Sequence, residues 1–278
     1  MVVLDGLFLI DIPRFQFLLI LIRFVMKTTT IILALLLLLL NLLFFSCSKS
    51  NDTDEPIDIS IYTYVPDDKF EELLIDLGYD NKMDDYVLTS NIKNVEVLSA
   101  YRCEGYGCSG FSIRDFTGLQ DFTNLKHFVC KDNDLSTLDL SKNTALTDLD
   151  CSDNDLTSLN LSQNLELKTL NCSGNRLTNL DVRNNIYLWR LYIGDDVFHD
   201  GNDLTNIDIS QNTDLKYLDC SGNRLTTLDV SNNNDLSYLD CKNNLIVCIQ
   251  LNQSQLEFMP WNNWYTDSEV IYSLICNN

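Results

Sequence analysis

Residues 146–164 read Leu-Thr-Asp-Leu-Asp-Cys-Ser-Asp-Asn-Asp-Leu-Thr-Ser-Leu-Asn-Leu-Ser-Gln-Asn, and their apolar, cysteine and asparagine positions recur in residues 167–185. The cysteines of such stretches keep an interval of 21 residues in two runs: Cys130, Cys151 and Cys172, and then Cys220 and Cys241. A repeat period in the low twenties is typical of a solenoid, in which each unit packs only against its neighbours. The sequence therefore predicts a stack of short coils.

One repeat unit follows the pattern L-x-x-L-x-C-x-x-N-x-L-x-x-L-x-L-x-x-N. Its copies begin at six leucines along the chain: Leu125, Leu146, Leu167, Leu188, Leu215 and Leu236. The unit that begins at Leu188 carries six extra residues, because Ile193 lies nine positions before Asn202 instead of three. A degenerate last frame contains Leu256, Met259 and Trp261, and we interpret it as the closing edge of the stack.

This pattern resembles the leucine-rich repeat, and the 21-residue form with cysteine on the strand is similar to that of internalin-type bacterial surface proteins. The resemblance covers about residues 85–262. It implies a leucine-rich repeat solenoid with a parallel β-sheet on its concave face and an irregular or 3-10 convex side. It also implies a protein ligand for that concave face.

Alternation of residue types supports this fold independently. It places Leu149 and Cys151 on the buried face of a short strand, and Asp148, Asp150 and Ser152 on the open face. An asparagine column at the bends is expected to hydrogen-bond the backbone there. The two halves of each unit are alike, so the sequence leaves open which half forms the concave strand.

We expect the cysteines of this column to be core residues with a packing role. Side chains in register on parallel strands point the same way at the ~4.8 Å strand spacing, which exceeds the ~3.8 Å between the Cβ atoms of a disulfide. Ile193 takes the same position in the fourth unit, as expected for a slot that holds a small hydrophobe. We therefore expect Cys151, Cys172 and Cys220 to be buried and reduced.

The N-terminal region predicts export. An apolar run from Ile31 to Phe45 follows Met26-Lys27 and ends at Ser46-Cys47, as is typical of a secretory signal. Because Cys47 directly follows a small residue, the segment resembles a bacterial lipoprotein signal peptide with Cys47 as the lipidated residue. A retained signal anchor is the alternative. Translation that starts at Met26 would make residues 1–25 an artefact of the assigned start.

These features divide the chain into five predicted segments. They are a signal peptide (1–46, with Met26 as an alternative start), a lipidated tether (47–60), an N-terminal cap (61–108), the leucine-rich repeats (109–255) and a C-terminal cap (256–278). Within the N-terminal cap, Asp67 to Gly78 predicts a helix with Asp67 as its cap and one apolar face. The expected location is the outer membrane or cell surface of a Gram-negative bacterium.

Charge and motif content narrow the classes of function. The chain has 19 Lys and Arg against 40 Asp and Glu, a net charge of −21, which argues against nucleic acid as a partner. Its two histidines, His127 and His199, are far apart in sequence and no nucleophile elbow or phosphate loop accompanies them. We expect no enzyme activity and no cofactor. We also expect no metal site, because Lys82 and Asp85 interrupt the calcium-loop-like run that starts at Asp80.

The remaining cysteines leave two readings open. In an exported chain Cys103 can pair with Cys108, and Cys248 with Cys276, or all four can remain free thiols. Neither pair has the neighbouring His or Cys residues of a zinc site.

The open face of the last strands gathers the residue types that anchor recognition surfaces. The predicted ligand-binding residues are Arg190, Tyr192, Tyr217, Asp219, Tyr238, Asp240 and Phe258. They favour a recognition module for an extracellular or host protein. A glycan stacked on the tyrosines, or a passive envelope scaffold whose aromatic residues merely cover the sheet, are the alternatives.

Overall fold

The computed structural model describes residues 59–276, apart from residues 105–106, 195–200 and 259–262 and the side chains of residues 59, 102–109 and 258. Contacts divide the chain into residues 1–57 and residues 58–278, and every element below belongs to the second unit. Cys47 and the predicted signal peptide lie outside the described residues. Within the described part, no helix combines the length and apolar character needed to cross a membrane.

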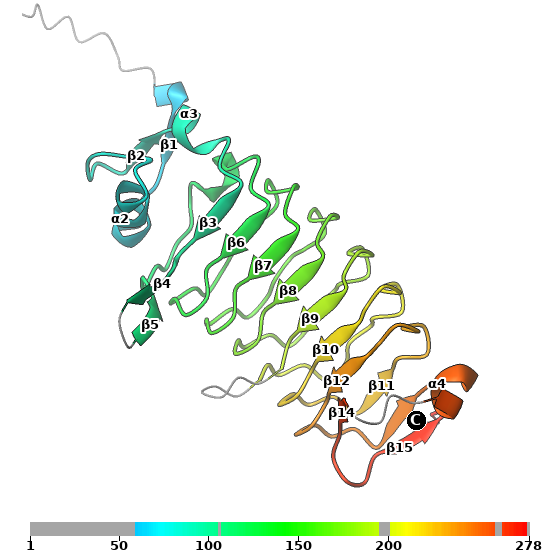
Figure 1. Ribbon diagram of the computed structural model, residues 1–278. Coiled ribbons are helices and arrows are strands. Elements are labelled where there is room, and N and C mark those ends of the chain that lie inside the picture. The colour runs from blue at the N-terminus through cyan, green and yellow to red at the C-terminus, as the bar shows by residue number, and fades with distance from the viewer. Residues whose placement is uncertain (1–58, 105–106, 195–200, 259–262, 277–278) are drawn as a thin grey trace, which may run out of the picture. The chain divides into compact units, whose positions relative to one another are not determined.

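The described part of the chain is a leucine-rich repeat solenoid, as the repeat pattern predicted. Its largest sheet has eight parallel strands in the order β14-β12-β10-β9-β8-β7-β6-β3, which run side by side across Figure 1. From the N-terminal end they are β3 (Val97–Ser99), β6 (His127–Val129), β7 (Asp148–Asp150), β8 (Thr169–Asn171), β9 (Arg190–Tyr192), β10 (Tyr217–Asp219), β12 (Tyr238–Asp240) and β14 (Trp264–Tyr265).

The central residue of each strand builds the core. Leu149, Leu170 and Leu191 pair in register on adjacent strands and are at most 1% exposed. The residue that follows each strand from β6 to β12 is buried as well, and these positions hold Cys130, Cys151, Cys172, Ile193, Cys220 and Cys241. Each coil therefore covers the apolar side of the next, and the core runs along the whole stack.

An asparagine in each coil connects it to the preceding one. Asn154 accepts a hydrogen bond from the backbone N–H of Leu135 (3.0 Å) and donates through Nδ2 to the carbonyl oxygens of Cys130 (3.0 Å) and Cys151 (3.2 Å). The same bonds recur one coil later around Asn175. The expected role of the asparagine column is confirmed: it satisfies buried backbone groups where the chain bends.

The structure settles which half of the unit is the concave strand: it is the half that contains the cysteine. The other half forms strands only near the C-terminal end of the described residues. There β11 (Thr227–Asp229), β13 (Cys248–Gln250) and β15 (Ile271–Ser273) make a parallel sheet of three strands.

The expectation for Ser152 was wrong. This residue is 1% exposed, because its hydroxyl donates a 2.6 Å hydrogen bond to Asp150 Oδ1 at the end of the strand. The next residue, Asp153, has a φ of 54°, and Gly174 holds the equivalent place with a φ of 59°. The chain therefore turns sharply at this point, and small or Asx residues suit the left-handed conformation.

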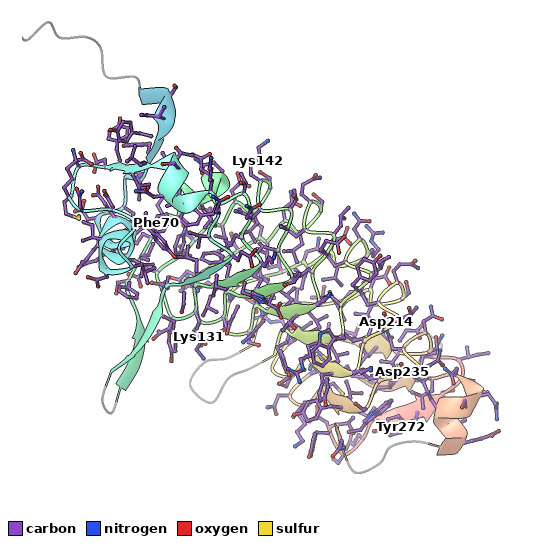
Figure 2. The ribbon with its side chains drawn as sticks, turned by 45° about the horizontal axis from the view of Figure 1, so that its top comes forward. Phe70, Lys131, Lys142, Asp214, Asp235 and Tyr272 are labelled. Atoms are coloured by element: carbon purple, nitrogen blue, oxygen red, sulfur yellow. A yellow bond between two sulfur atoms is a disulfide. The ribbon has the colours of Figure 1, made fainter. Side chains whose placement is uncertain are left out.

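The N-terminal end is covered by η1 (Ile59–Ile61), β1 (Tyr62–Tyr64), α2 (Asp68–Asp76), β2 (Tyr86–Leu88) and α3 (Thr89–Ile92). The predicted helix is confirmed: Asp67 caps α2 through bonds to the N–H groups of Lys69 and Phe70, and Gly78 follows its end with a φ of 78°. Phe70 is fully buried at this end of the stack (Figure 2). The helix thus gives the first coil an apolar cover.

A hairpin and a short helical turn interrupt the first coils. The hairpin pairs β4 (Tyr101–Glu104) with β5 (Gly107–Gly110) and places Cys103 opposite Cys108, whose side chains lie outside the described ones. A 3-10 turn, η2 (Leu119–Asp121), follows. The parallel sheet begins at β3, before this hairpin, so the first sheet strand lies inside the predicted N-terminal cap. The segment boundaries themselves stay predictions.

At the C-terminal end, helix α4 (Gln253–Phe258) lies between β13 and β14. A disulfide joins Cys248 of β13 to Cys276, so this pair is cross-linked in the structure. Both C-terminal strands extend existing sheets: β14 pairs with β12, and β15 pairs with β13.

Candidate ligand-binding face

Two columns of side chains cross the open face of the large sheet. The first column contains His127, Asp148, Thr169, Arg190, Tyr217 and Tyr238, which pair in register from β6 to β12. The second contains Val129, Asp150, Asn171, Tyr192, Asp219, Asp240 and Tyr265. The structure therefore brings six of the seven predicted ligand residues onto three adjacent strands, with Arg190, Tyr217 and Tyr238 in one column and Tyr192, Asp219 and Asp240 in the other.

The seventh predicted residue, Phe258, is not on the sheet. It is the last residue of α4, and the strand that continues the sheet is Trp264–Tyr265 instead. The sequence frame was extended one unit too far, since the chain leaves the repeat after β13 and forms a helix before it returns. Tyr265 pairs in register with Asp240, so the aromatic residue of β14 lies in the second column, with its ring beside that of Tyr238.

Aromatic rings form a continuous ladder on this face. The ring centres of Tyr217 and Tyr238 are 6.2 Å apart, and those of Tyr238 and Tyr265 are 5.7 Å apart. Trp189, directly before β9, meets Tyr217 edge-on with 6.1 Å between ring centres. Parallel strands hold these rings at nearly constant spacing, so the ladder is a rigid platform.

A cation lies at each end of the ladder. The guanidinium carbon of Arg190 is 4.0 Å from the ring centre of Trp189 and 5.0 Å from that of Tyr217. At the other end, Lys242 Nζ is 4.7 Å from the ring centre of Tyr265. Such cation–π contacts restrict long basic side chains that would otherwise be mobile.

The acids of the second column are anchored at the end of their strands. Asp219 Oδ1 accepts hydrogen bonds from the hydroxyl (2.6 Å) and the backbone N–H (3.1 Å) of Ser221. Asp240 Oδ1 accepts one from the N–H of Lys242 (3.2 Å). A Cβ at Gly194 would lie 2.3 Å from Asp219 Oδ1, so glycine there makes room for the bonded pair.

The two carboxylates act on the neighbouring tyrosine. Burial, followed by the charges of Asp219 and Asp240, raises the pKa of Tyr238 above its ordinary value. The phenol therefore stays neutral, and able to donate a hydrogen bond, up to a higher pH than an ordinary tyrosine. The face combines neutral rings with fixed negative charge.

The other half of the sheet is more polar. A shallow hollow of about 200 Å³ lies there, and residues from β6 to β9 line it. At its edge His127 Nδ1 lies 2.9 Å from Asp148 Oδ2, and Thr147 Oγ1 donates a 2.7 Å hydrogen bond to the same oxygen. Asp148 is thus held by two neighbours, and this half offers fewer rings for contact.

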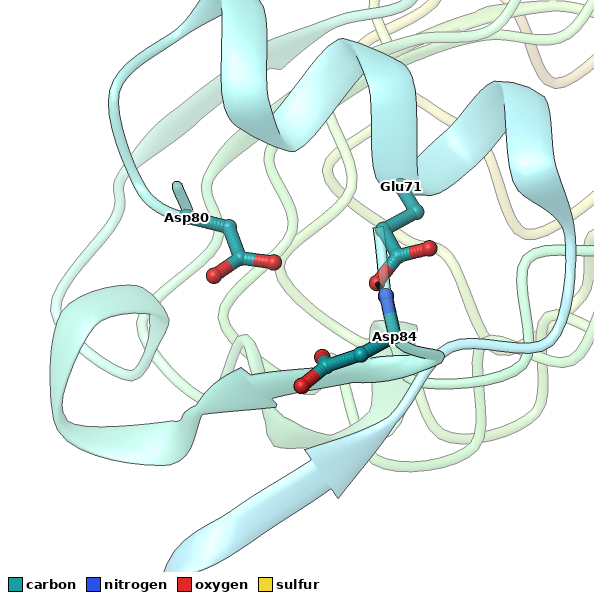
Figure 3. A group of neighbouring side chains, drawn as sticks. All are labelled: Glu71, Asp80 and Asp84. Atoms are coloured by element: carbon teal, nitrogen blue, oxygen red, sulfur yellow. Dashed lines mark hydrogen bonds between the residues drawn. The ribbon is translucent and has the colours of Figure 1, made fainter. Parts of the chain in front are cut away.

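Three carboxylates meet in the N-terminal cap, as Figure 3 shows. Oxygen atoms of Glu71, Asp80 and Asp84 lie within 4.8 Å of one another. Glu71 is 1% exposed and accepts a 2.7 Å hydrogen bond from the N–H of Asp84, while Asp84 pairs with Lys82. These contacts fasten residues 79–85 to α2, and we assign the group this structural role.

The cysteine column is buried and chemically quiet. Cys130, Cys151, Cys172, Cys220 and Cys241 are free thiols at most 1% exposed, as predicted for the ladder. Burial raises the pKa of the Cys220 thiol well above its ordinary value. Such thiols remain protonated and unreactive in the folded chain.

Two ladder residues escaped the sequence analysis. Trp189 stands where the other units carry Lys126, Thr147, Lys168, Lys216 and Ser237, and that departure from the repeat was the available signal. Tyr265 had no such signal, because α4 separates it from the repeat frame.

The solved structures similar to this chain include internalins and other leucine-rich repeat proteins. Internalin C2 from Listeria monocytogenes has a TM-score of 0.53 and 20% identity, with 77% of this chain and 95% of that chain covered. The functional domain of InlJ from Listeria monocytogenes, which includes a cysteine ladder, has a TM-score of 0.40 and 24% identity, with 76% and 61% covered. A leucine-rich repeat protein of Leptospira interrogans has a TM-score of 0.43 and 22% identity, with 58% and 47% covered.

This chain thus spans about three fifths of the InlJ domain, and the likeness to internalin C2 shows the fold alone. No protein-family model matches the sequence, and no curated protein matches it at a significant level.

Proposed function

We propose that this protein is a recognition module that binds a protein ligand on the concave sheet, over the strands from β9 to β14. The observation that carries the proposal is the ladder Tyr217–Tyr238–Tyr265, with Arg190 stacked at one end and Lys242 at the other. Large rings held on rigid strands provide contact area at small entropic cost. The internalin neighbours add support at the level of fold, and we propose a binding role without catalysis.

The proposed setting is the envelope of a Gram-negative bacterium. The run from Met26 to Phe45 followed by Ser46-Cys47 supports export and lipidation of Cys47. The Cys47→Ser variant should remain unprocessed or leave the membrane fraction, whereas Cys241→Ser should fractionate like the parent protein. Unchanged processing and fractionation of Cys47→Ser would contradict the anchor.

A binding screen tests the proposed function. The purified protein is screened against extracellular proteins and, in a parallel arm, against glycans. For any ligand found, the double variant Tyr217→Ala/Tyr238→Ala should abolish binding with little change in melting temperature. Tyr187→Ala is the matched control, because Tyr187 is 48% exposed in the turn before β9 and outside the ladder. A ligand that binds the double variant normally would exclude this face.

Salt dependence separates the two ligand classes. A basic protein partner is attracted by a chain of charge −21, so its association should weaken as ionic strength rises. Stacking of a neutral sugar on the tyrosines should hardly change. Salt-insensitive binding of a neutral glycan would replace the protein ligand with the glycan alternative.

A further inference from the structure

Arg190 differs from the other arginines whose side chains the structure describes. Each of the others pairs with an acid: Arg114 with Asp134 (3.5 Å), Arg176 with Asp155 (2.7 Å), Arg183 with Asp181 (2.8 Å) and Arg224 with Asp203 (2.8 Å). Arg190 has no ion pair among the described residues, and its Nε is buried without a hydrogen-bond partner. This is unexpected in a chain with twice as many acids as bases.

The side chain of Arg190 is nevertheless held in place. Its guanidinium lies over the rings of Trp189 and Tyr217 at 4.0 Å and 5.0 Å, and Tyr217 pairs with it in register on the next strand. The two rings meet at 77°, so they contact the guanidinium from two directions and restrict its movement. The guanidinium is therefore oriented in advance, while its Nε makes no hydrogen bond to the described residues.

We propose that Arg190 is a subsite for a carboxylate of the ligand, supplied by an acidic side chain of the protein partner. A carboxylate matches the fork of guanidinium donors and can accept two parallel hydrogen bonds. It carries a single charge, which suits a site one strand away from Asp219 better than a doubly charged phosphate does. The inference rests on the proposed function, since it names one contact within that face.

The tyrosines next to Arg190 indicate which group of the ligand lies beside the bound carboxylate. Tyr217 contacts Arg190 on one side and Tyr238 on the other, so a ring or aliphatic group next to the acid would reach the tyrosines. The preferred element of the partner is thus an acidic residue beside a large apolar one. The net charge of the chain alone would select the opposite, a basic segment.

A dipeptide probe tests the subsite without knowledge of the partner. Acetyl-Glu-Phe-amide is titrated into the full-length protein in neutral detergent and followed by saturation-transfer NMR, with acetyl-Gln-Phe-amide as the uncharged isostere. The glutamate probe should bind at least about tenfold more tightly than the isostere, as expected for a charge-assisted bidentate contact. Equal affinities, or no saturable binding of the glutamate probe, would overturn the proposal.

Variants assign the effect to one residue. Arg190→Gln should remove the preference for the glutamate probe, and Arg190→Lys should restore part of it, because lysine keeps the charge and loses the fork. Arg183→Gln is the control, since Arg183 is exposed and paired with Asp181. A preference that persists in Arg190→Gln would overturn the assignment. If Arg190→Gln does not fold, the comparison of Arg190→Lys with the parent decides.

A further arm separates the source of the carboxylate. Glucuronate offers the same group on a sugar, and tighter binding of glucuronate than of the dipeptide would overturn the choice of a protein side chain. Failure of the Arg190 subsite can also be told apart from failure of the proposed function. If the glutamate probe does not bind, the binding role of the tyrosine ladder is still tested by the double variant Tyr217→Ala/Tyr238→Ala. If the probe binds but the screen finds no protein ligand, that outcome counts against the recognition role.

Discussion

Tyr217 and Tyr238 occupy the same position on adjacent parallel strands, and their ring centres are 6.2 Å apart with the ring planes tilted by 31°. The two rings form one surface, so a ligand group that covers one also contacts the other. We expect each single change to alanine to weaken a ligand of this face by about 2 kcal/mol or more. In a double-mutant cycle measured by calorimetry, the two losses should not add. Additive losses would show two separate contacts.

Asn175 connects its own coil to the preceding one. It accepts from the N–H of Leu156 (3.0 Å) and donates to the carbonyl oxygens of Cys151 (3.0 Å) and Cys172 (3.1 Å). Asn175→Ala should leave these buried groups unpaired and lower the free energy of unfolding by about 2–4 kcal/mol, by urea titration. Asn179→Ala, on an exposed residue of the same unit, should change it by less than about 0.5 kcal/mol. Similar losses for both variants would contradict this role.

Stability should fall at alkaline pH because of the buried thiols. Burial raises the pKa of the Cys241 thiol to about 12 from its ordinary value of 9.0, so the folded chain keeps a proton that the unfolded chain loses in this window. The stabilisation is complete below pH 9 and is lost as pH rises toward 12, at up to ~1.4 kcal/mol per pH unit for each thiol. The curve of unfolding free energy against pH should be shallower for Cys241→Ala. Parallel curves for parent and variant would refute the effect.

The disulfide between Cys248 and Cys276 closes a separation of 28 residues and links β13 to the end of the described chain. Loss of such a cross-link costs about 3–4 kcal/mol in the chain-entropy model. We expect Cys276→Ser to lower the melting temperature and to make the segment after β14 sensitive to limited proteolysis. Reducing agent should have the same effect on the parent and none on Cys276→Ser. A parent protein indifferent to reducing agent would show that the bond does not stabilise it.

Much of the fold followed from local pattern. A period of 21 residues, with alternation around each cysteine, was enough to place Leu149, Leu170 and Cys151 inside, because a buried strand face tolerates only apolar side chains. The cap of α2 was predictable for the same kind of reason. Asp67 and Gly78 act on backbone within one turn of themselves.

Contacts between segments that are distant in the chain could not be predicted from the sequence. Both halves of each unit alternate in the same way, so the choice of the concave strand depended on how whole coils pair. The frame error at Phe258 has a similar origin, since nothing local shows that Tyr265 returns to the sheet after α4. The contacts of Arg190 with Trp189 and Tyr217 join two coils as well. The sequence alone determined the repeat, because the repeat is encoded by residues close together in the chain. The binding face became clear only in the tertiary structure, because its residues come together when one coil packs on another.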